Sequence, residues 1–228
     1  MKVNGSINPP RFTLEIQPRN PERTLARFHQ NAEYFTDARE SGSTSGWEYD
    51  EYCLEFPTSD TLEVEIKAHY WEYLKQAMEA EGASEAEYIS VARNAALERI
   101  SGKCSAAIYI DVDVNGKHYT LSKNEQDALA IAQTKVDKGA TVVLYGDGLK
   151  DAATITAISA AAYEWGVVCT TYCAYLKQYI AAETDVDKLA AIDFGKALPD
   201  SYMQQLAALL NSAGIDITKY TAALTAAN

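Results

Sequence analysis

The feature that most constrains this fold is an uninterrupted helical pattern from Thr154 to Ala182. The segment contains no proline and one glycine, and its apolar residues return at helical spacing. This periodicity is typical of one long packed helix. Shorter helices are expected to follow, with start signals near Thr184 and Asp200.

The first 57 residues have a different pattern. Phe12, Leu14 and Ile16 alternate with polar residues, which predicts a half-buried strand that ends at Pro18. Residues 25–35 are compatible with a strand or a short helix, and residues 40–46 are expected to form a polar loop. Residues 47–56 are rich in aromatic residues and favour a second strand. We therefore expect a small N-terminal sheet or ribbon.

Two helices are predicted next. Asp60 and Glu63 mark the start of the first, which is expected to end at Gly82. Ser84 and Glu87 form a capping box for the second, which is expected to end at Gly102. Because the link between them is short, the two helices are expected to form an antiparallel hairpin that covers the sheet.

The chain then returns to β structure for a short stretch. An alternating run from Ala106 to Val114 leads into Asn115 and Gly116, both of which tolerate positive φ, so a β-hairpin is predicted. A capped helix is expected from Ser122, and a short strand at residues 141–145. The fold class is therefore α+β. The expected domains are a β-rich region with its covering helix at 1–82 and a mostly helical part containing the β-hairpin at 83–228.

Charge and segment composition exclude several function classes. With 20 Lys and Arg against 32 Asp and Glu, the formal charge is −12, which argues against nucleic-acid binding. The first twenty residues do not resemble a signal peptide, and no membrane-spanning helix is expected. Synthesis and retention in a cytoplasm are therefore expected, with all four cysteines reduced and mostly buried.

The strongest metal-binding motif is Asp111-Val-Asp113-Val-Asn115-Gly116. Oxygen ligands at alternate positions followed by glycine resemble the first half of a calcium-binding loop. The twelfth position is Ser122 where a glutamate is needed, and the motif follows a strand-like run. A hairpin with Asp111, Asp113 and Asn115 on its solvent face is the favoured interpretation, and no metal or cofactor is predicted.

No catalytic constellation is evident. His29, His69 and His118 fall in three different predicted elements, without a nucleophile motif or a phosphate-binding loop. Cys169 and Cys173 lie on one helical face, but nothing completes a metal site, so both are interpreted as core residues. The chain is predicted not to be an enzyme.

Aromatic residues suggest an interaction surface instead. Tyrosine occurs 15 times, and rings of this kind supply contact area in protein interfaces. Trp47, Tyr49, Tyr52 and Trp71 are the partner-binding candidates, with Trp71 the best candidate for an outward ring. The alternative is an aromatic core between the sheet and its helices.

The sequence from Gly116 to Leu129, the turn at residues 142–148 and the long helix to Ile180 together resemble a family of phage and prophage tail-region domains of unknown function. The resemblance covers roughly residues 83–192, and Gly46–Tyr52 is similar to the leading part of such proteins. The family carries no catalytic residues that transfer to this chain.

The resemblance implies a structural protein of the tail tip, baseplate or tail-fibre region. It would be made in the host cytoplasm and located in the virion, and would bind other tail proteins as a homo-oligomer. Two alternatives are a tail-fibre assembly chaperone that is absent from the mature particle and a small acidic inhibitor of a host protein.

Overall fold

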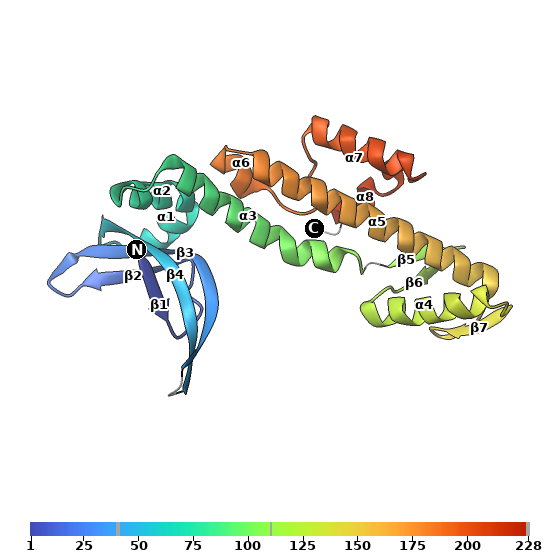
Figure 1. Cartoon of the computed structure of the whole chain (residues 1–228). Helices are drawn as coiled ribbons and strands as arrows, with labels where there is room; N and C mark the ends of the chain where they lie inside the picture. Colours follow the sequence, from blue (N-terminus) through green and yellow to red (C-terminus); the bar gives the residue numbers. More distant parts are fainter. Residues whose placement is uncertain (40–41, 110, 227–228) are drawn as a thin grey trace. The chain divides into compact units, whose positions relative to one another are not determined.

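The structure is a computed structural model that describes residues 1–39, 42–109 and 111–226. It confirms the α+β class, with 53% helix and 25% strand (Figure 1). The chain divides into two compact units. The sheet unit comprises Met1–Ala95 and Thr184–Ala191, and the helical unit comprises Ala96–Glu183 and Ile192–Asn228.

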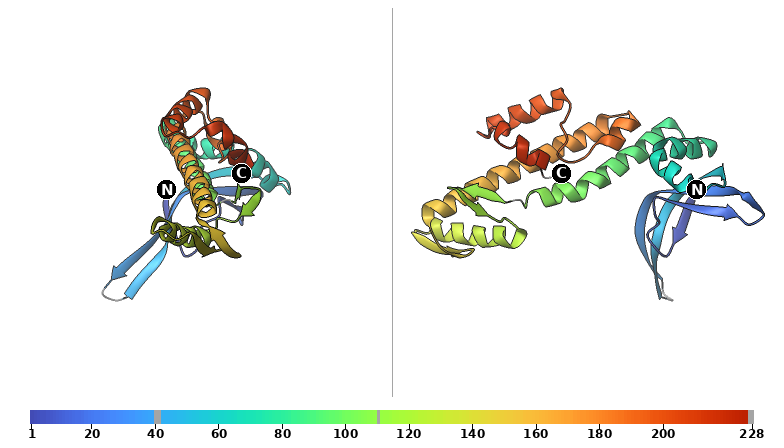
Figure 2. Two further views of the ribbon diagram at one scale, coloured as in Figure 1. Left: turned by 90° about the vertical axis from the view of Figure 1, so that its right-hand side faces the viewer. Right: turned by 180° about the vertical axis from the view of Figure 1, so that it is seen from behind.

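The sheet unit contains one antiparallel sheet with strand order β1-β4-β3-β2. Its strands are β1 (Lys2–Gly5), β2 (Phe12–Gln17), β3 (Asn20–Arg39) and β4 (Gly42–Pro57). The predicted strands at Phe12 and at residues 47–56 are confirmed, and residues 25–35 form part of β3. In Figure 2 the β3–β4 hairpin extends past β1 and β2.

The loop predicted at residues 40–46 is wrong for residues 42–46, which begin β4, while residues 40 and 41 lie outside the described residues. These small polar residues pair with β3, from Arg39 opposite Gly42 to Phe35 opposite Gly46. A ladder is held by backbone groups, so polar side chains do not prevent strand pairing.

Helices α1 (Leu62–Ala68) and α2 (Tyr70–Ala80) cover one face of this sheet (Figure 1). The single helix predicted here is interrupted at His69, whose φ of −117° and ψ of 31° leave the helical region. The cap predicted at Asp60 is also wrong, because Thr61 is the N-cap residue. Gly82, with φ of 82°, follows α2 as expected.

Helix α3 (Glu85–Ala107) begins at the predicted capping box. The Ser84 amide donates to Glu87 Oε2 (2.7 Å), and the Glu87 amide donates to Ser84 Oγ (3.3 Å). The predicted end at Gly102 is wrong, since the helix continues to Ala107. One exposed glycine costs a helix only about 1 kcal/mol, which its neighbours can offset.

The core of the sheet unit lies between the sheet and its helices. Phe28 is fully buried, and its ring meets Phe12 and Tyr70 at centroid distances of 6.3 and 5.7 Å. Other buried members of this core include Ala26, Leu62, Ile66, Leu74, Ala77, Met78, Tyr88 and Val91.

The helical unit begins with the end of α3 and a short hairpin. Strands β5 (Val112–Val114) and β6 (Lys117–Tyr119) flank Asn115 and Gly116, which have φ of 54° and 74° as predicted. The predicted strand start at Ala106 is wrong because that residue belongs to α3, and Ile110 lies outside the described residues.

The next helix of the chain is followed by a second hairpin, which packs against it. Ser122 caps α4 (Lys123–Asp137), as predicted, by accepting a hydrogen bond from the Glu125 amide. The predicted strand is β7 (Val142–Tyr145), and it pairs with β8 (Gly148–Asp151), which was not predicted.

Helix α5 (Ala152–Ala182) is the predicted long helix. Ile155 and Ile158 pack with Leu121, Leu129 and other members of the helical unit's core. By length and composition alone α5 could cross a membrane, although no spanning helix was expected. Because its buried stripe also suits the central helix of a folded domain, this property does not assign a location.

Shorter elements complete the chain. They are α6 (Val186–Ala191), which belongs to the sheet unit, α7 (Asp200–Ser212), a 3-10 turn η1 (Ile217–Lys219) and α8 (Thr221–Ala226). The predicted starts near Thr184 and Asp200 fall next to α6 and α7.

The expectation of four reduced cysteines is wrong for two of them. Cys104 in α3 and Cys173 in α5 form a disulfide, with Cα atoms 6.0 Å apart. Sixty-nine residues separate them in sequence, so no local pattern signals the pair. Cys53 and Cys169 are free, and burial raises the pKa of Cys169 to about 12.

Candidate functional site

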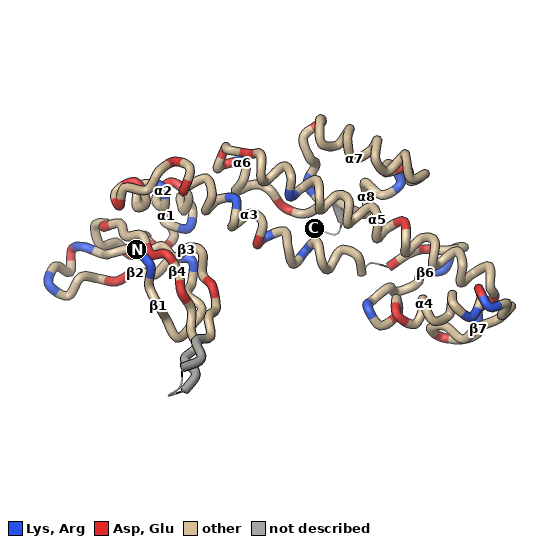
Figure 3. The backbone as a smooth tube through the Cα atoms, viewed as in Figure 1, with Lys and Arg blue, Asp and Glu red and all other residues tan. Residues whose placement is uncertain are grey.

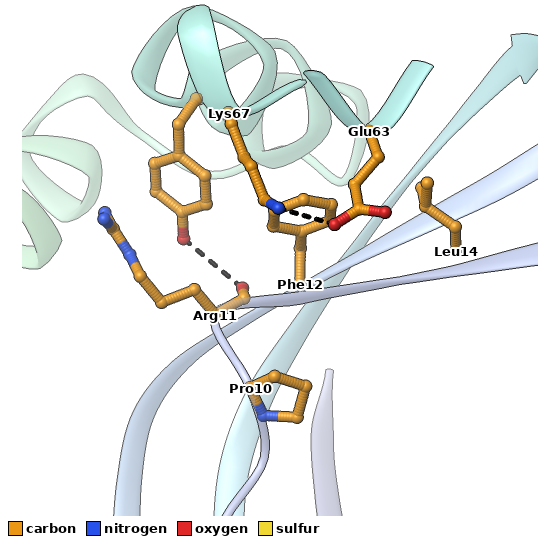
Figure 4. A pocket seen from close by; sticks show the side chains of 7 residues that line it. Pro10, Arg11, Phe12, Leu14, Glu63 and Lys67 are labelled. Carbon is orange, nitrogen blue, oxygen red and sulfur yellow. Dashed lines mark hydrogen bonds and ion pairs between the residues drawn. The ribbon is translucent and has the colours of Figure 1, made fainter. Parts of the chain in front are cut away.

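A groove of about 550 Å³ lies in the sheet unit between β2 and α1 (Figure 4). Its lining comes from the start of β2 and the two residues before it on one side, and from α1 and the first residue of α2 on the other. The lining residues are Pro10, Arg11, Phe12, Leu14, Glu63, Lys67 and Tyr70.

The floor of the groove is apolar. Phe12 and Leu14 point to the helix-covered face of the sheet, because alternate residues of a strand share a face. The Phe12 and Tyr70 rings are 6.4 Å apart. Both strand residues are only half buried, so part of their apolar surface stays accessible to a ligand.

The α1 wall is charged. Glu63 and Lys67 lie one helical turn apart and form an ion pair of 2.6 Å, with both side chains mostly exposed (Figure 4). An exposed pair at this spacing contributes only about 0.3–0.5 kcal/mol, so it can rearrange around a ligand.

Arg11 supplies a positive charge directly before β2. Its guanidinium carbon lies 4.0 Å from the Tyr70 ring centroid and 5.6 Å from that of Trp71. Within the described part of the chain, Arg11 forms no ion pair with a carboxylate. Stacking on two rings therefore fixes the position of a cation that remains available to an anionic group.

Tyr70 holds the backbone of Arg11 through a hydrogen bond. Its hydroxyl accepts a hydrogen bond from Gln30 and donates to the carbonyl oxygen of Arg11 (3.5 Å). Burial raises the pKa of Tyr70, so its phenol stays protonated at neutral pH and keeps its role as a donor.

Strand β2 forms one edge of the sheet. The His29 amide of β3 donates to the carbonyl oxygen of Arg11 (3.0 Å). By the alternation of an antiparallel ladder, the backbone groups of Phe12, Leu14 and Ile16 then point to the outer edge. Among the described residues no strand pairs with that edge, so it is open next to the groove.

The opposite face of the sheet carries a polar network. Buried Glu51 accepts a hydrogen bond from Arg27 (2.8 Å) and lies 3.5 Å from His29 Nε2, while Arg27 also pairs with exposed Glu15 (2.9 Å). His29 Nδ1 lies 2.7 Å from the Pro10 carbonyl oxygen. These contacts tie β2, β3 and β4 together, which gives His29 a structural role.

The predicted partner-binding aromatics do not form one cluster. Trp47 packs edge-on against Tyr34, which is 61% exposed, and Tyr49 packs against His29 on the open face. Tyr52 and Trp71 pack against the core on the helix-covered side. Of the four, Trp71 is the one connected to the groove, through Arg11.

The candidate calcium ligands lie in the helical unit, on the β5–β6 hairpin and just before it. His118 lies between the carboxylates, with Nε2 2.8 Å from Asp111 and Nδ1 3.1 Å from Asp113. Both carboxylates raise the pKa of this exposed imidazole. Among the described residues no group of three His, Cys, Asp or Glu is arranged to hold a metal ion.

Sequence reasoning missed Arg11, Glu63 and Lys67 as parts of a site and left Tyr70 out of the partner-binding candidates. The Pro9-Pro10-Arg11 run before an alternating strand was the available signal. It could not identify the groove, because the edge position of β2 depends on strand order and Tyr70 lies 59 residues from Arg11.

Comparison of the chain with protein-family models, curated proteins and solved structures finds no match.

Proposed function

We propose that this protein is a structural, protein-binding component of the tail tip, baseplate or tail-fibre region of a bacteriophage or prophage. The location is suggested by the resemblance of residues 116–129, 142–148 and the long helix to phage tail-region domains. The mode of action is suggested by the β2–α1 groove, and that groove is the observation that carries the proposal.

The groove combines three properties suited to binding another polypeptide. It has an apolar floor at Phe12 and Leu14, an open strand edge and an available cation at Arg11. Trp47 and Tyr34 supply a second aromatic contact on the other face of the sheet. Such features favour docking over turnover, so we propose no enzymatic activity.

Under this proposal the protein is made in the host cytoplasm and incorporated into the virion, as a homo-oligomer in contact with other tail proteins. The acidic-inhibitor alternative receives less support. Figure 3 shows Asp and Glu spread along both units, whereas an inhibitor of a basic protein needs them gathered on one face.

The same groove favours a tail-fibre assembly chaperone as a second candidate. A chaperone must hold an exposed segment of an unassembled partner, and an open edge strand beside an apolar groove can do so.

Quantitative mass spectrometry of purified particles from the encoding phage or induced prophage tests the proposal. A structural component is expected at one fixed copy number per particle, and deletion of its gene should yield particles with defective tails. A protein that binds fibre protein during infection but is missing from finished particles would instead be a chaperone. A protein that is absent from finished particles and does not bind fibre protein during infection would contradict both candidates.

A further inference from the structure

We propose that the β2–α1 groove binds the C-terminal segment of a partner protein as an added antiparallel strand on β2, with its terminal carboxylate on Arg11. This inference rests on the proposed function in that the ligand is another protein, and it specifies which part of that protein is bound.

The backbone of β2 provides the first argument. Its outer edge presents the peptide groups of Phe12, Leu14 and Ile16, which can pair with an extended segment. An added strand places every second side chain on the helix-covered face of the sheet, over Phe12 and Leu14. Main-chain pairing then gives affinity, and the apolar floor selects apolar side chains at alternate positions.

The N-terminal end of β2 provides the second argument. Pro9 and Pro10 precede Arg11, and a proline has no backbone N–H to extend the ladder. An added strand is therefore expected to end close to Arg11. In an antiparallel strand that end is the C-terminus, whereas a parallel strand would bring its positive N-terminus to a guanidinium.

Charge provides the third argument. The chain carries 32 acidic residues and a net charge of −12, yet Arg11 forms no ion pair among the described residues. Lys67, the other cation of the groove, is paired with Glu63. Arg11 is held over Tyr70 and Trp71 with its planar donors available, and such a group matches a carboxylate in a bidentate geometry.

The probe is a library of random decapeptides displayed with free C-termini, selected on the full-length protein. Selected peptides are expected to have apolar residues at alternate positions near the C-terminus. Each selected peptide is then resynthesised as the free acid and as the C-terminal amide. The acid is expected to bind about tenfold more tightly, because the amide lacks one charge-assisted contact. N-methylation of single backbone amides of the peptide should weaken binding at every second position, where the amide pairs with β2, and should have little effect at the positions between them.

Arg11→Gln is expected to reduce the ratio of acid to amide affinity to about one. Arg11→Lys, which keeps the charge, should give an intermediate ratio. Arg19→Gln is the matched control, because it removes an exposed arginine in the β2–β3 turn, outside the groove lining, and should leave the ratio unchanged. Circular dichroism of all variants confirms that they fold.

The inference is overturned if no sequence is enriched, if acid and amide bind equally well, or if Arg11→Gln and Arg19→Gln have equal effects. Particle composition decides the proposed function separately. If the protein is incorporated into virions but binds no peptide, only this inference is contradicted. If it binds the peptides but is absent from particles, only the proposed role in the virion is contradicted.

Discussion

The two units use their aromatic, sulfur and cationic side chains differently. In the helical unit, three such side chains of α5 bond within the unit: Trp165 donates to the Ala107 carbonyl oxygen (2.6 Å), Tyr172 donates to that of Lys196 (2.6 Å), and Cys173 is in the disulfide. Tyr163 of the same helix is exposed. In the sheet unit, Arg11 and Tyr34 remain accessible at the surface. This difference is consistent with the proposal that partners bind to the sheet unit.

The two units also differ in the size and charge of their grooves. The groove between α4 and α5 has a volume of about 390 Å³, against about 550 Å³ for the β2–α1 groove. Its lining, from Gln126 to Tyr163, contains no charged residue and lies between helices, whose backbone groups are already paired. Of these two grooves among the described residues, the one in the sheet unit combines a cation with an open strand edge.

The largest expected effect comes from the two cores. Phe28→Ala should destabilise the sheet unit by about 3–5 kcal/mol, and Trp165→Ala should do the same in the helical unit, because each removes a fully buried ring. Hydrogen exchange should accelerate mainly in β2–β4 for the first variant and in α4 and α5 for the second. Identical exchange patterns in both variants would contradict the division into two units.

Loss of the disulfide should be the next largest effect and should act on the helical unit. Cys104→Ser/Cys173→Ser is expected to lower the free energy of unfolding by about 2–4 kcal/mol, since the bond closes a long loop. Urea unfolding measures the change, with Cys53→Ser as the control. Four free thiols in the native, unreduced protein would show that the bond does not form.

The polar network of the sheet unit should contribute less. Glu51→Ala is expected to cost about 1–3 kcal/mol, because it leaves partly buried Arg27 and buried His29 without a shared partner. Glu15→Ala removes a more exposed partner of the same arginine and should cost about 0–1 kcal/mol. Equal losses in urea unfolding would contradict the role assigned to Glu51.

Helix caps allow a finer comparison. Ser84→Ala in the sheet unit should cost about 1–2 kcal/mol, because it removes a hydroxyl that accepts from the Glu87 amide and donates to Glu87 Oε2. Ser122→Ala in the helical unit should cost about 0.5 kcal/mol, since its hydroxyl accepts one long bond (3.4 Å). The reverse order in thermal unfolding would show that cap geometry does not control these helices.

The smallest expected effect is the titration of His118. Its folded-state pKa should exceed the usual value of about 6.5, because Asp111 and Asp113 bond to the charged imidazole. The resulting stabilisation is present below the unfolded pKa and is lost as the pH rises through the raised folded pKa. NMR titration should show a lower pKa in Asp111→Asn and no change in Asp137→Asn; an unshifted pKa in the wild type would remove the interaction.

Local signals predicted much of this fold. The capping box at Ser84 and Glu87, the turn at Asn115 and Gly116 and the alternation around Phe12 all involve residues close in sequence, so one segment contains the whole physical cause. These features were predicted at the correct positions.

Features set by distant residues were not predictable in this way. The Cys104–Cys173 bond joins two helices, and Arg11 stacks on rings that belong to α2. The four partner-binding aromatics were grouped by sequence proximity, but strand alternation separates Tyr49 from Tyr52 onto opposite faces. The candidate site therefore depends on strand order and helix placement, which periodicity does not specify.

Amide hydrogen exchange, measured for the isolated protein and for the protein in purified tail particles, tests the proposed docking surface most directly. The amides of Phe12, Leu14 and Ile16, which face the open edge of β2, are expected to become protected in particles, while the His29 amide, already bonded to Arg11, should change little. Unchanged exchange along β2, with new protection confined to the helical unit, would contradict the assignment of partner binding to the sheet unit.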